Sequence, residues 1–325
     1  MEIIVLDMGH GNCVGIFDEE TSPFILDCGS ENNKVNNFTN IIKCEIEKSK
    51  SRDLAITHYH FDHYNLLGTL PENFFDNIYL PSLPSGSSTA DAILEFLALA
   101  TLSGYQEYYL IPMILTRGKN IKPKEKGDSF NAVGRSWEVL WPDYSIIDKI
   151  NRRSVETFLN KIDEIKKKLS EKQLEEFDKL YAYLSVAFGR ESKESDASLE
   201  EISKDKDVKP KVQEYLVEIE MKFKNLANRA SLVIRDDHTN FLFTGDVDKT
   251  ILNNYLNFGN ELYFLVEASH HGGFYGYAFD NMSTEVIVIS RKASYKPDYR
   301  YLVDLSWNII VDTARVGNCK IWSKT

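Results

Sequence analysis

Short apolar runs separated by turn residues occupy both ends of the chain. In the first half these runs cover residues 2–7, 13–17, 24–27, 53–57, 78–80, 108–115 and 137–141. In the last third they cover residues 231–235, 241–244, 262–266, 285–290 and 309–312. Runs of this length, bounded by glycine, asparagine or aspartate, predict β-strands.

The middle of the chain has a different period. Over residues 146–184 and 212–226, apolar residues recur every three or four positions among dense lysine and glutamate, which predicts three amphipathic helices. Two more helices are predicted at residues 37–48 and 89–102, the second with Thr89 as its N-cap. Residues 189–211 are almost entirely polar and predict a flexible loop.

Together these patterns predict an α/β fold with an inserted helical module. Residues 1–145 and 227–325 would form the strand-rich domain, and residues 146–226 would form the helical insertion. We find no internal repeat with a period of about 20 to 50 residues.

Composition excludes a few classes of function. The 325 residues include 38 Lys and Arg against 49 Asp and Glu, a net charge of −11, and 12% are aromatic. The aromatic content argues against disorder over most of the chain, and the net charge argues against a protein that coats DNA. A polyanionic substrate would have to meet a local basic patch or bound metal.

The first residues lack the basic segment and the cleavage site of a secretory signal. No apolar stretch approaches the roughly 18 residues of a membrane span. We therefore expect a soluble, cytoplasmic protein without a membrane partner.

Three of the seven histidines directly follow a predicted strand, in the segment from Thr57 to His63. His58 and His60 are two residues apart and can turn toward one point, while Asp62 and His63 can face a second point a few ångströms away. Imidazole and carboxylate are ligands of zinc, iron and manganese, so this spacing predicts a site for two metals.

Two other strand ends carry the same residue types. Asp246 follows the predicted strand at 241–244, and His270 and His271 follow the strand at 262–266. Five of the seven histidines thus lie in two motifs at strand ends beside carboxylates, which favours a functional site over isolated surface or core histidines.

The segment from His58 to His63, together with Gly68, resembles the H-x-H-x-D-H signature of the metallo-β-lactamase fold. Further segments resemble the C-terminal hydrolase domain of the ComEC/Rec2 DNA-uptake proteins and follow in the same order: residues 6–12, 25–29, 137–142, 228–233, 242–246 and 270–272. The resemblance implies an αββα sandwich with a binuclear metal site at the edge of its two sheets.

The resemblance also implies roles for individual residues. His58 and His60 would bind the first metal, and Asp62 and His63 the second. Asp246 would bridge both metals, and Asp62 or Asp246 would orient a hydroxide bound between them. That hydroxide would attack the substrate.

One of His270 and His271 would complete the second metal site, and Gly272 favours His271. Asp27 would hold a ligand histidine or the turn beneath the site. The third histidine that usually binds the first metal is missing, and Asn228 stands nearby instead. Because a site with fewer nitrogens tolerates harder ions, the two ions could be zinc or manganese.

The roles of two other histidines are not decided by the sequence. His238, in a polar turn, is a weak candidate for the missing ligand. His10, in the turn at residues 9–12, either lines the cleft or has no role in the site.

Basic residues in two places are candidates for substrate binding. Arg291, Lys292 and Lys296 follow the predicted strand at 285–290 and would present charge to a phosphate. The basic run at residues 117–124 either borders the cleft or is a solvated loop.

The prediction is a metal-dependent phosphodiesterase or nuclease acting on DNA or RNA. One alternative is a small-molecule hydrolase that opens a cyclic nucleotide or a lactone. Another is a metal-containing binding or regulatory protein whose helical insertion contacts a protein partner.

Overall fold

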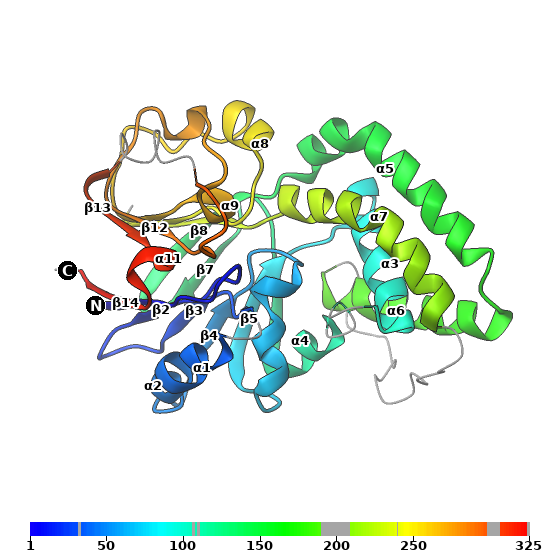
Figure 1. The fold of residues 1–325 in the computed structure, drawn as a ribbon, viewed down its shortest axis with the longest axis horizontal. Coiled ribbons are helices and arrows are strands. Elements are labelled where there is room, and N and C mark those ends of the chain that lie inside the picture. Colours follow the sequence, from blue (N-terminus) through cyan, green and yellow to red (C-terminus); the bar gives the residue numbers. More distant parts are fainter. Residues whose placement is uncertain are drawn as a thin grey trace.

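A computed structural model describes residues 1–31, 34–105, 108, 111–189, 209–238, 240–297 and 306–323. Within these residues the strands form two mixed sheets of seven strands each. Figure 1 shows the strands on one side of the molecule and the long helices on the other.

The first sheet joins the chain's N-terminal strands to its last one. Its order is β14 (Cys319–Trp322), β1 (Glu2–Val5), β2 (Val14–Phe17), β3 (Phe24–Leu26), β4 (Asp53–Ala55), β5 (Phe75–Pro81) and β6 (Gly118–Lys124). The strands from β14 to β3 pair antiparallel, and those from β3 to β6 pair parallel.

The second sheet repeats this division. Its order is β13 (Ser306–Asp312), β12 (Ser283–Ile289), β11 (Leu262–Glu267), β10 (Phe241–Phe243), β9 (Val233–Asp236), β8 (Arg135–Trp141) and β7 (Ser129–Ala132). The strands from β13 to β10 pair parallel, and those from β10 to β7 pair antiparallel.

Alternate residues of both sheets share one apolar cluster, which places the sheets face to face. Ile3, Val14 and Phe24 enter it from the first sheet, and Trp137 and Phe243 enter it from the second. The rings of Phe24 and Trp137 lie 5.0 Å apart. Burial of this cluster removes a large apolar area from water and holds the sheets together.

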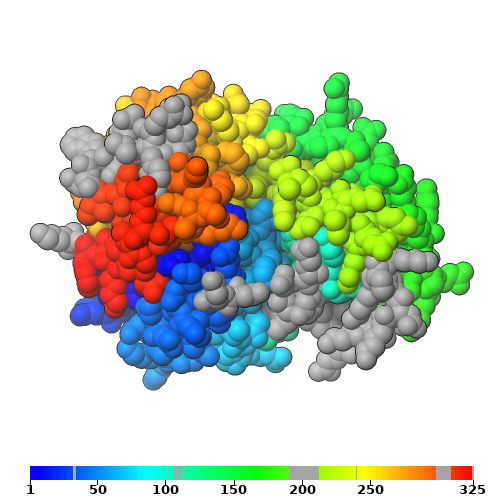
Figure 2. Space-filling model, viewed as in Figure 1, coloured from blue at the N-terminus to red at the C-terminus, as the bar shows by residue number. Residues whose placement is uncertain are grey.

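Four long helices form a second core beside the sheets: α3 (Ser88–Ser103), α5 (Tyr144–Lys166), α6 (Glu171–Ala187) and α7 (Lys209–Arg229). The helix α3 packs against each of the other three. Its Phe96 is fully buried and stacks on Phe223 of α7, with ring centroids 4.0 Å apart. Figure 2 shows α7, in yellow-green, exposed on the surface next to the sheets.

The remaining helical segments are short. They are α1 (Val35–Asn37), η2 (Phe38–Lys43), α2 (Cys44–Ile46), η3 (Phe61–His63), η4 (Asn65–Thr69), α4 (Ile111–Arg117), α8 (Lys249–Asn254), α9 (Ser269–Gly272), η7 (Tyr277–Phe279) and α11 (Thr313–Val316).

The predicted α/β class and the helices at 89–102, 146–184 and 212–226 are confirmed. The helices α5, α6 and α7 lie in the chain between β8 and β9, which pair with each other. They share one apolar cluster with α3 and with the outer faces of the sheets, so the insertion at 146–226 is packed into the fold.

Three local predictions were wrong. The apolar run at 108–115 contributes to helix α4, because a short buried run has no period that separates helix from strand, and Pro112 suits a first helical turn. The basic run at 117–124 is mostly the edge strand β6, where lysines are common because they discourage pairing with another chain. The N-cap of α3 is Ser87, whose Oγ accepts from Ala90 N–H, while Thr89 is buried inside the helix.

The predicted polar loop at 189–211 falls mostly outside the described residues, and residues 209–211 belong to α7. Among the described residues, the helices lack the length and apolar character that a membrane-spanning segment needs.

Replacing Phe96 by alanine tests the shared core. We expect a loss of about 3–5 kcal/mol in the free energy of unfolding, the usual effect of a large buried cavity. Urea denaturation followed by circular dichroism should still show a single transition, because the insertion and the sheets share one apolar cluster. The control Val217→Ala, at a position that is 59% exposed on α7, should change stability by less than about 0.5 kcal/mol. A separate early transition would contradict this account of the fold.

Candidate metal centre

The residues of the predicted site meet where the parallel strands of both sheets end. Asp27 follows β3 and His58 follows β4 in the first sheet. Asp246 follows β10, and His270 and His271 follow β11 in the second sheet. Carboxyl ends of parallel strands lie at one edge of a sheet, which is where α/β folds commonly place their sites.

The buried carboxylate of Asp27 connects β3 to the histidine segment. It accepts hydrogen bonds from Thr57 N–H (2.7 Å), Thr57 Oγ1 (2.9 Å), Asn12 Nδ2 (3.0 Å) and His63 Nδ1 (2.7 Å). Asp27 itself has a left-handed backbone, with φ of 56°, and its N–H donates to the carbonyl of Ala55. This carboxylate therefore fixes the start of the segment and the ring of His63.

Backbone hydrogen bonds also fix the segment from His58 to His63. Cys28 N–H donates to the His63 carbonyl (2.8 Å), and Asn12 N–H donates to the Asp62 carbonyl (3.2 Å). A Cβ added at Gly29 would lie 1.8 Å from that same Asp62 oxygen, so only glycine fits there.

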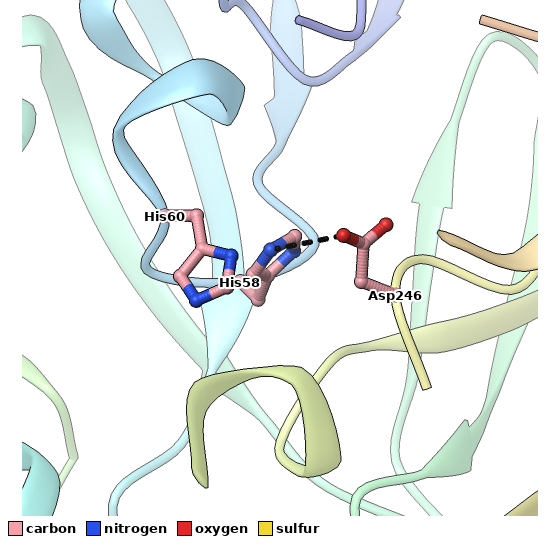
Figure 3. A group of neighbouring side chains, drawn as sticks. All are labelled: His58, His60 and Asp246. Atoms are coloured by element: carbon pink, nitrogen blue, oxygen red, sulfur yellow. Dashed lines mark ion pairs between the residues drawn. The ribbon is translucent and has the colours of Figure 1, made fainter. Parts of the chain in front are cut away.

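The structure brings the seven predicted ligand residues together. His58, His60 and Asp246 form one group, and all three are buried (Figure 3). Asp62, His63 and His271 form a second group. Within each group the potential ligand atoms lie within 4.8 Å of one another. The division into groups is the one that the resemblance implies, while binding of metal by these residues stays a prediction.

One oxygen of Asp246 lies close to both groups. Its Oδ2 is 3.7 Å from His58 Nε2, and Figure 3 shows His58 between His60 and Asp246. The same oxygen is 3.9 Å from His63 Nε2 and 3.8 Å from His271 Nε2. These three distances exceed those of hydrogen bonds, while a fourth ring nitrogen, His270 Nδ1, lies 3.2 Å from the same oxygen.

His58, His63 and His271 make their hydrogen bonds through Nδ1, and the Nε2 atom of each ring faces Asp246. His63 Nδ1 contacts the Asp27 carboxylate, and His271 Nδ1 contacts the Ser290 carbonyl at 2.6 Å. Both partners only accept, so Nδ1 of each ring carries a hydrogen, and Nε2 presents a lone pair whenever the ring is neutral. The Nδ1 of His58 lies 3.0 Å from Thr57 Oγ1.

The Nε2 atoms of His58, His60 and His63 are buried and make no hydrogen bond. Burying a polar atom without a partner costs free energy, and bound cations would give all three atoms a partner. The outer partners on Nδ1 are those that orient metal-binding histidines. The residues present therefore fit two divalent ions.

The electrostatics agree with this fit. Burial and the neighbouring imidazoles of His63 and His60 hold the pKa of His58 well below its usual value, and burial lowers the pKa of His60 to about 4. For Asp246, burial favours the neutral acid, but the surrounding histidines outweigh it and hold its pKa well below the usual range. Neutral imidazoles around an ionised carboxylate are the donor set of zinc and manganese sites.

His63 is the exception, because burial lowers its pKa but three carboxylates together outweigh burial. Asp27, Asp62 and Asp246 raise the pKa of His63 to about 10. This environment favours positive charge at the ring, which a divalent cation would also provide.

His270 and His271 both have left-handed backbones, with φ of 50° and 55°. Such a pair is rare outside glycine and is retained only where the surroundings enforce it. The result separates the two rings: His271 joins the second group, as Gly272 favours, while His270 Nδ1 lies 3.2 Å from Asp246 Oδ2. Asn228 Nδ2 lies 3.3 Å from His270 Nδ1, so the residue near the missing third histidine is part of the site.

A cavity of about 780 Å³ opens over both groups. Its walls consist of His10, Ser30, Glu31, His60, Phe61, Asp62, Tyr108, Glu220, Met221, Lys224, Asn225, Asn228, Asp246, Asp248, His270, His271 and Phe274. Five of these residues, from Glu220 to Asn228, belong to α7 of the insertion.

The three basic residues predicted to bind substrate do not line this cavity. Arg291 is buried, pairs with Asp312 at 2.6 Å and donates to carbonyls of its own loop, because a buried guanidinium needs fixed partners. Lys292 pairs with Glu31 at 3.3 Å, and Lys296 is exposed. The basic run at 117–124 also lies outside the cavity walls, and Arg117 donates to the Leu67 carbonyl.

Sequence reasoning missed several residues that shape the site. Thr57 and Ser290 orient ligand histidines, and Asn12 donates to both Asp27 and Glu267. His10 was not missed, because lining the cleft was one of its two predicted alternatives: it lines the cavity and stacks on His271, with ring centroids 4.8 Å apart. Thr57 and Glu267 stand beside the histidine motifs, and Asn12 lies in a segment that carries the resemblance, so these three positions carried some signal. His238 lies in an exposed turn outside both groups.

The chain matches no protein-family model and no curated protein sequence. The assignment of the site therefore depends on its geometry and chemistry.

The substitution Asp27→Asn tests the partner of His63. Asparagine keeps the size and tolerates the left-handed backbone, but its NH₂ group can no longer accept the hydrogen bonds that converge on one oxygen. We expect affinity for Mn²⁺ or Zn²⁺, measured by isothermal titration calorimetry, to fall about 10- to 100-fold.

The matched control is Asp237→Asn, in the exposed turn after β9, which should bind metal like the unmodified chain. Unchanged affinity in a folded Asp27→Asn protein would contradict the role assigned to this carboxylate.

Proposed function

We propose that this protein is a metal-dependent hydrolase of phosphodiesters, with nucleic acids or nucleotides as its substrate class. The observation that carries the proposal is the pair of His and Asp groups, in which Asp246 of the first group also lies 3.8 Å from His271 of the second. The donors fit two ions held close together, the arrangement of two-metal phosphoester hydrolases.

The fold supports the same proposal. Two facing sheets with helices outside them, and a site at the ends of their parallel strands, are consistent with the αββα sandwich of the metallo-β-lactamase type. The segments that resemble ComEC-like hydrolase domains include those that carry Asp27, Asn228, Asp246 and His271, while His58 belongs to the H-x-H-x-D-H segment that resembles the metallo-β-lactamase signature.

The residues of the chain would have the following roles in hydrolysis. When bound, two divalent ions would neutralise phosphate charge and lower the pKa of an attacking water. His58 and His60 would hold one ion, and His63 and His271 the other. Asp62 and Asp246 would hold the ions and accept a proton from the attacking water. His270 faces the cavity outside both groups. Burial lowers the pKa of His270, but the carboxylate of Asp246 outweighs burial and raises it, so this imidazole is the candidate for protonating the leaving oxygen.

A specific observation favours a small substrate over a polymer. The volume of the cavity, about 780 Å³, falls in the range of small-ligand clefts. Hydrolysis of a small nucleotide phosphodiester is therefore the second candidate function beside cleavage of long DNA or RNA.

A cleavage assay tests the proposal. The unmodified chain should hydrolyse bis-p-nitrophenyl phosphate with Mn²⁺ or Zn²⁺ and lose this activity with a chelator. The variant Asp246→Asn should lose about 100-fold or more, because it removes the carboxylate that lies near both groups. Asp237→Asn is the control and should retain full activity. Hydrolysis that persists with the chelator, or in a folded Asp246→Asn protein, would overturn the proposal.

A further inference from the structure

The charges on the cavity wall are uneven. Five carboxylates line it: Glu31, Asp62, Glu220, Asp246 and Asp248. Among the lining residues of the described chain, one lysine and no arginine faces them, and this lysine is Lys224 of α7. Two of the carboxylates have their own cations, since Glu31 pairs with Lys292 and Asp248 pairs with Arg229 at 2.6 Å.

A long nucleic acid is a poor match for such a wall. Each phosphate of a bound polymer needs a nearby lysine or arginine for favourable binding. The lysines of β6 do not line the cavity, and Lys119 is engaged with Asp76 at 2.6 Å. Charge therefore favours a substrate with few phosphates.

Lys224 is held in place by Glu220, which is itself fixed by Tyr105. Its Nζ lies 2.9 Å from Glu220 Oε1, one turn earlier on α7. The other oxygen of Glu220 accepts a hydrogen bond from Tyr105 Oη at 2.7 Å. Glu220 is mostly buried, whereas the Lys224 side chain is 41% exposed and can reach a ligand.

The same turn of α7 lies beside the first group of candidate ligands. The ring of Phe223 lies 6.3 Å from that of His60, and Asn228 lies one turn further along. Lys224 is thus a cation on the wall next to His60, outside both candidate metal groups.

We propose that Lys224 binds a second phosphate of a short nucleotide substrate, beside the phosphodiester that is hydrolysed at Asp246. The inference depends on the proposed function, since it takes the two groups as the place of hydrolysis. The ions would neutralise the reacting phosphate, so a neighbouring terminal phosphate would need a cation from the protein. Glu220 holds Lys224 in position and competes with that phosphate for it.

The test compares two dinucleotides and bis-p-nitrophenyl phosphate. One dinucleotide is TpT, and the other is pTpT, which adds a 5′-phosphate. With Mn²⁺, the unmodified chain should favour pTpT over TpT by about tenfold in kcat/KM, the effect of one charge-assisted hydrogen bond.

Three variants separate the roles. In Lys224→Gln the preference for pTpT should disappear through a higher KM, while kcat and the hydrolysis of bis-p-nitrophenyl phosphate stay unchanged. Glu220→Gln keeps an acceptor for Tyr105 but removes the competing charge, so KM for pTpT should fall. The control Lys222→Gln, on α7 outside the cavity walls, should behave like the unmodified chain.

The possible results distinguish the two proposals. If bis-p-nitrophenyl phosphate and both dinucleotides stay intact, the proposed function fails. If bis-p-nitrophenyl phosphate is hydrolysed but Lys224→Gln retains the preference for pTpT, or the unmodified chain shows none, the role of Lys224 is wrong. Faster cleavage of long single-stranded DNA than of pTpT would overturn the inference that the substrate is short.

Discussion

Burial of charged and polar groups at one edge of the fold is the constraint on which this site depends. The carboxylate of Asp246 is almost fully buried, and ring nitrogens of His58, His63, His270 and His271 lie within 3.9 Å of its Oδ2. Removing such groups from water costs several kcal/mol unless they find partners of opposite charge. The Nδ1 atoms of His58, His63 and His271 have partners in the protein. Their Nε2 atoms face the carboxylate of Asp246, where a cation would satisfy them. A pair of divalent ions would satisfy both the carboxylates and these Nε2 atoms, which is why the unusual composition of this edge is best explained as a metal centre.

The two sheets make this edge possible, and the insertion turns it into a cleft. The parallel strands β3 and β4 deliver Asp27 and His58, while β10 and β11 deliver Asp246 and His271 from the facing sheet. Left-handed backbone at Asp27 and His271 turns the chain sharply as each strand ends, a strain that the packed surroundings maintain. The helix α7 packs on α3 through Phe223 and adds the wall that carries Lys224. In the proposed hydrolase, the catalytic groups would thus come from the sheets, and the groups that would select the substrate would come from the insertion.

The sequence predicted the parts of the site that depend on local spacing. His58, His60, Asp62 and His63 stand one or two positions apart directly after β4, so one short segment places all four at the end of that strand. Asp246 and His271 were recognisable because they also follow strands. The partners Ser290 and Thr57 were missed because a backbone carbonyl or a hydroxyl has no distinctive sequence pattern. The role of Arg291 was mistaken because burial, which pairs it with Asp312, depends on tertiary packing. Strand and helix were confused at 108–115 because a short apolar run fits either.

The most direct test of the central claim is anomalous diffraction from crystals of the full chain grown with Mn²⁺. The account predicts two anomalous peaks about 3.5–4 Å apart. One should be bound by His58 and His60 and the other by His63 and His271, with Asp246 in contact with both. Crystals with no ion at either group, or with a single ion away from Asp246, would contradict the account.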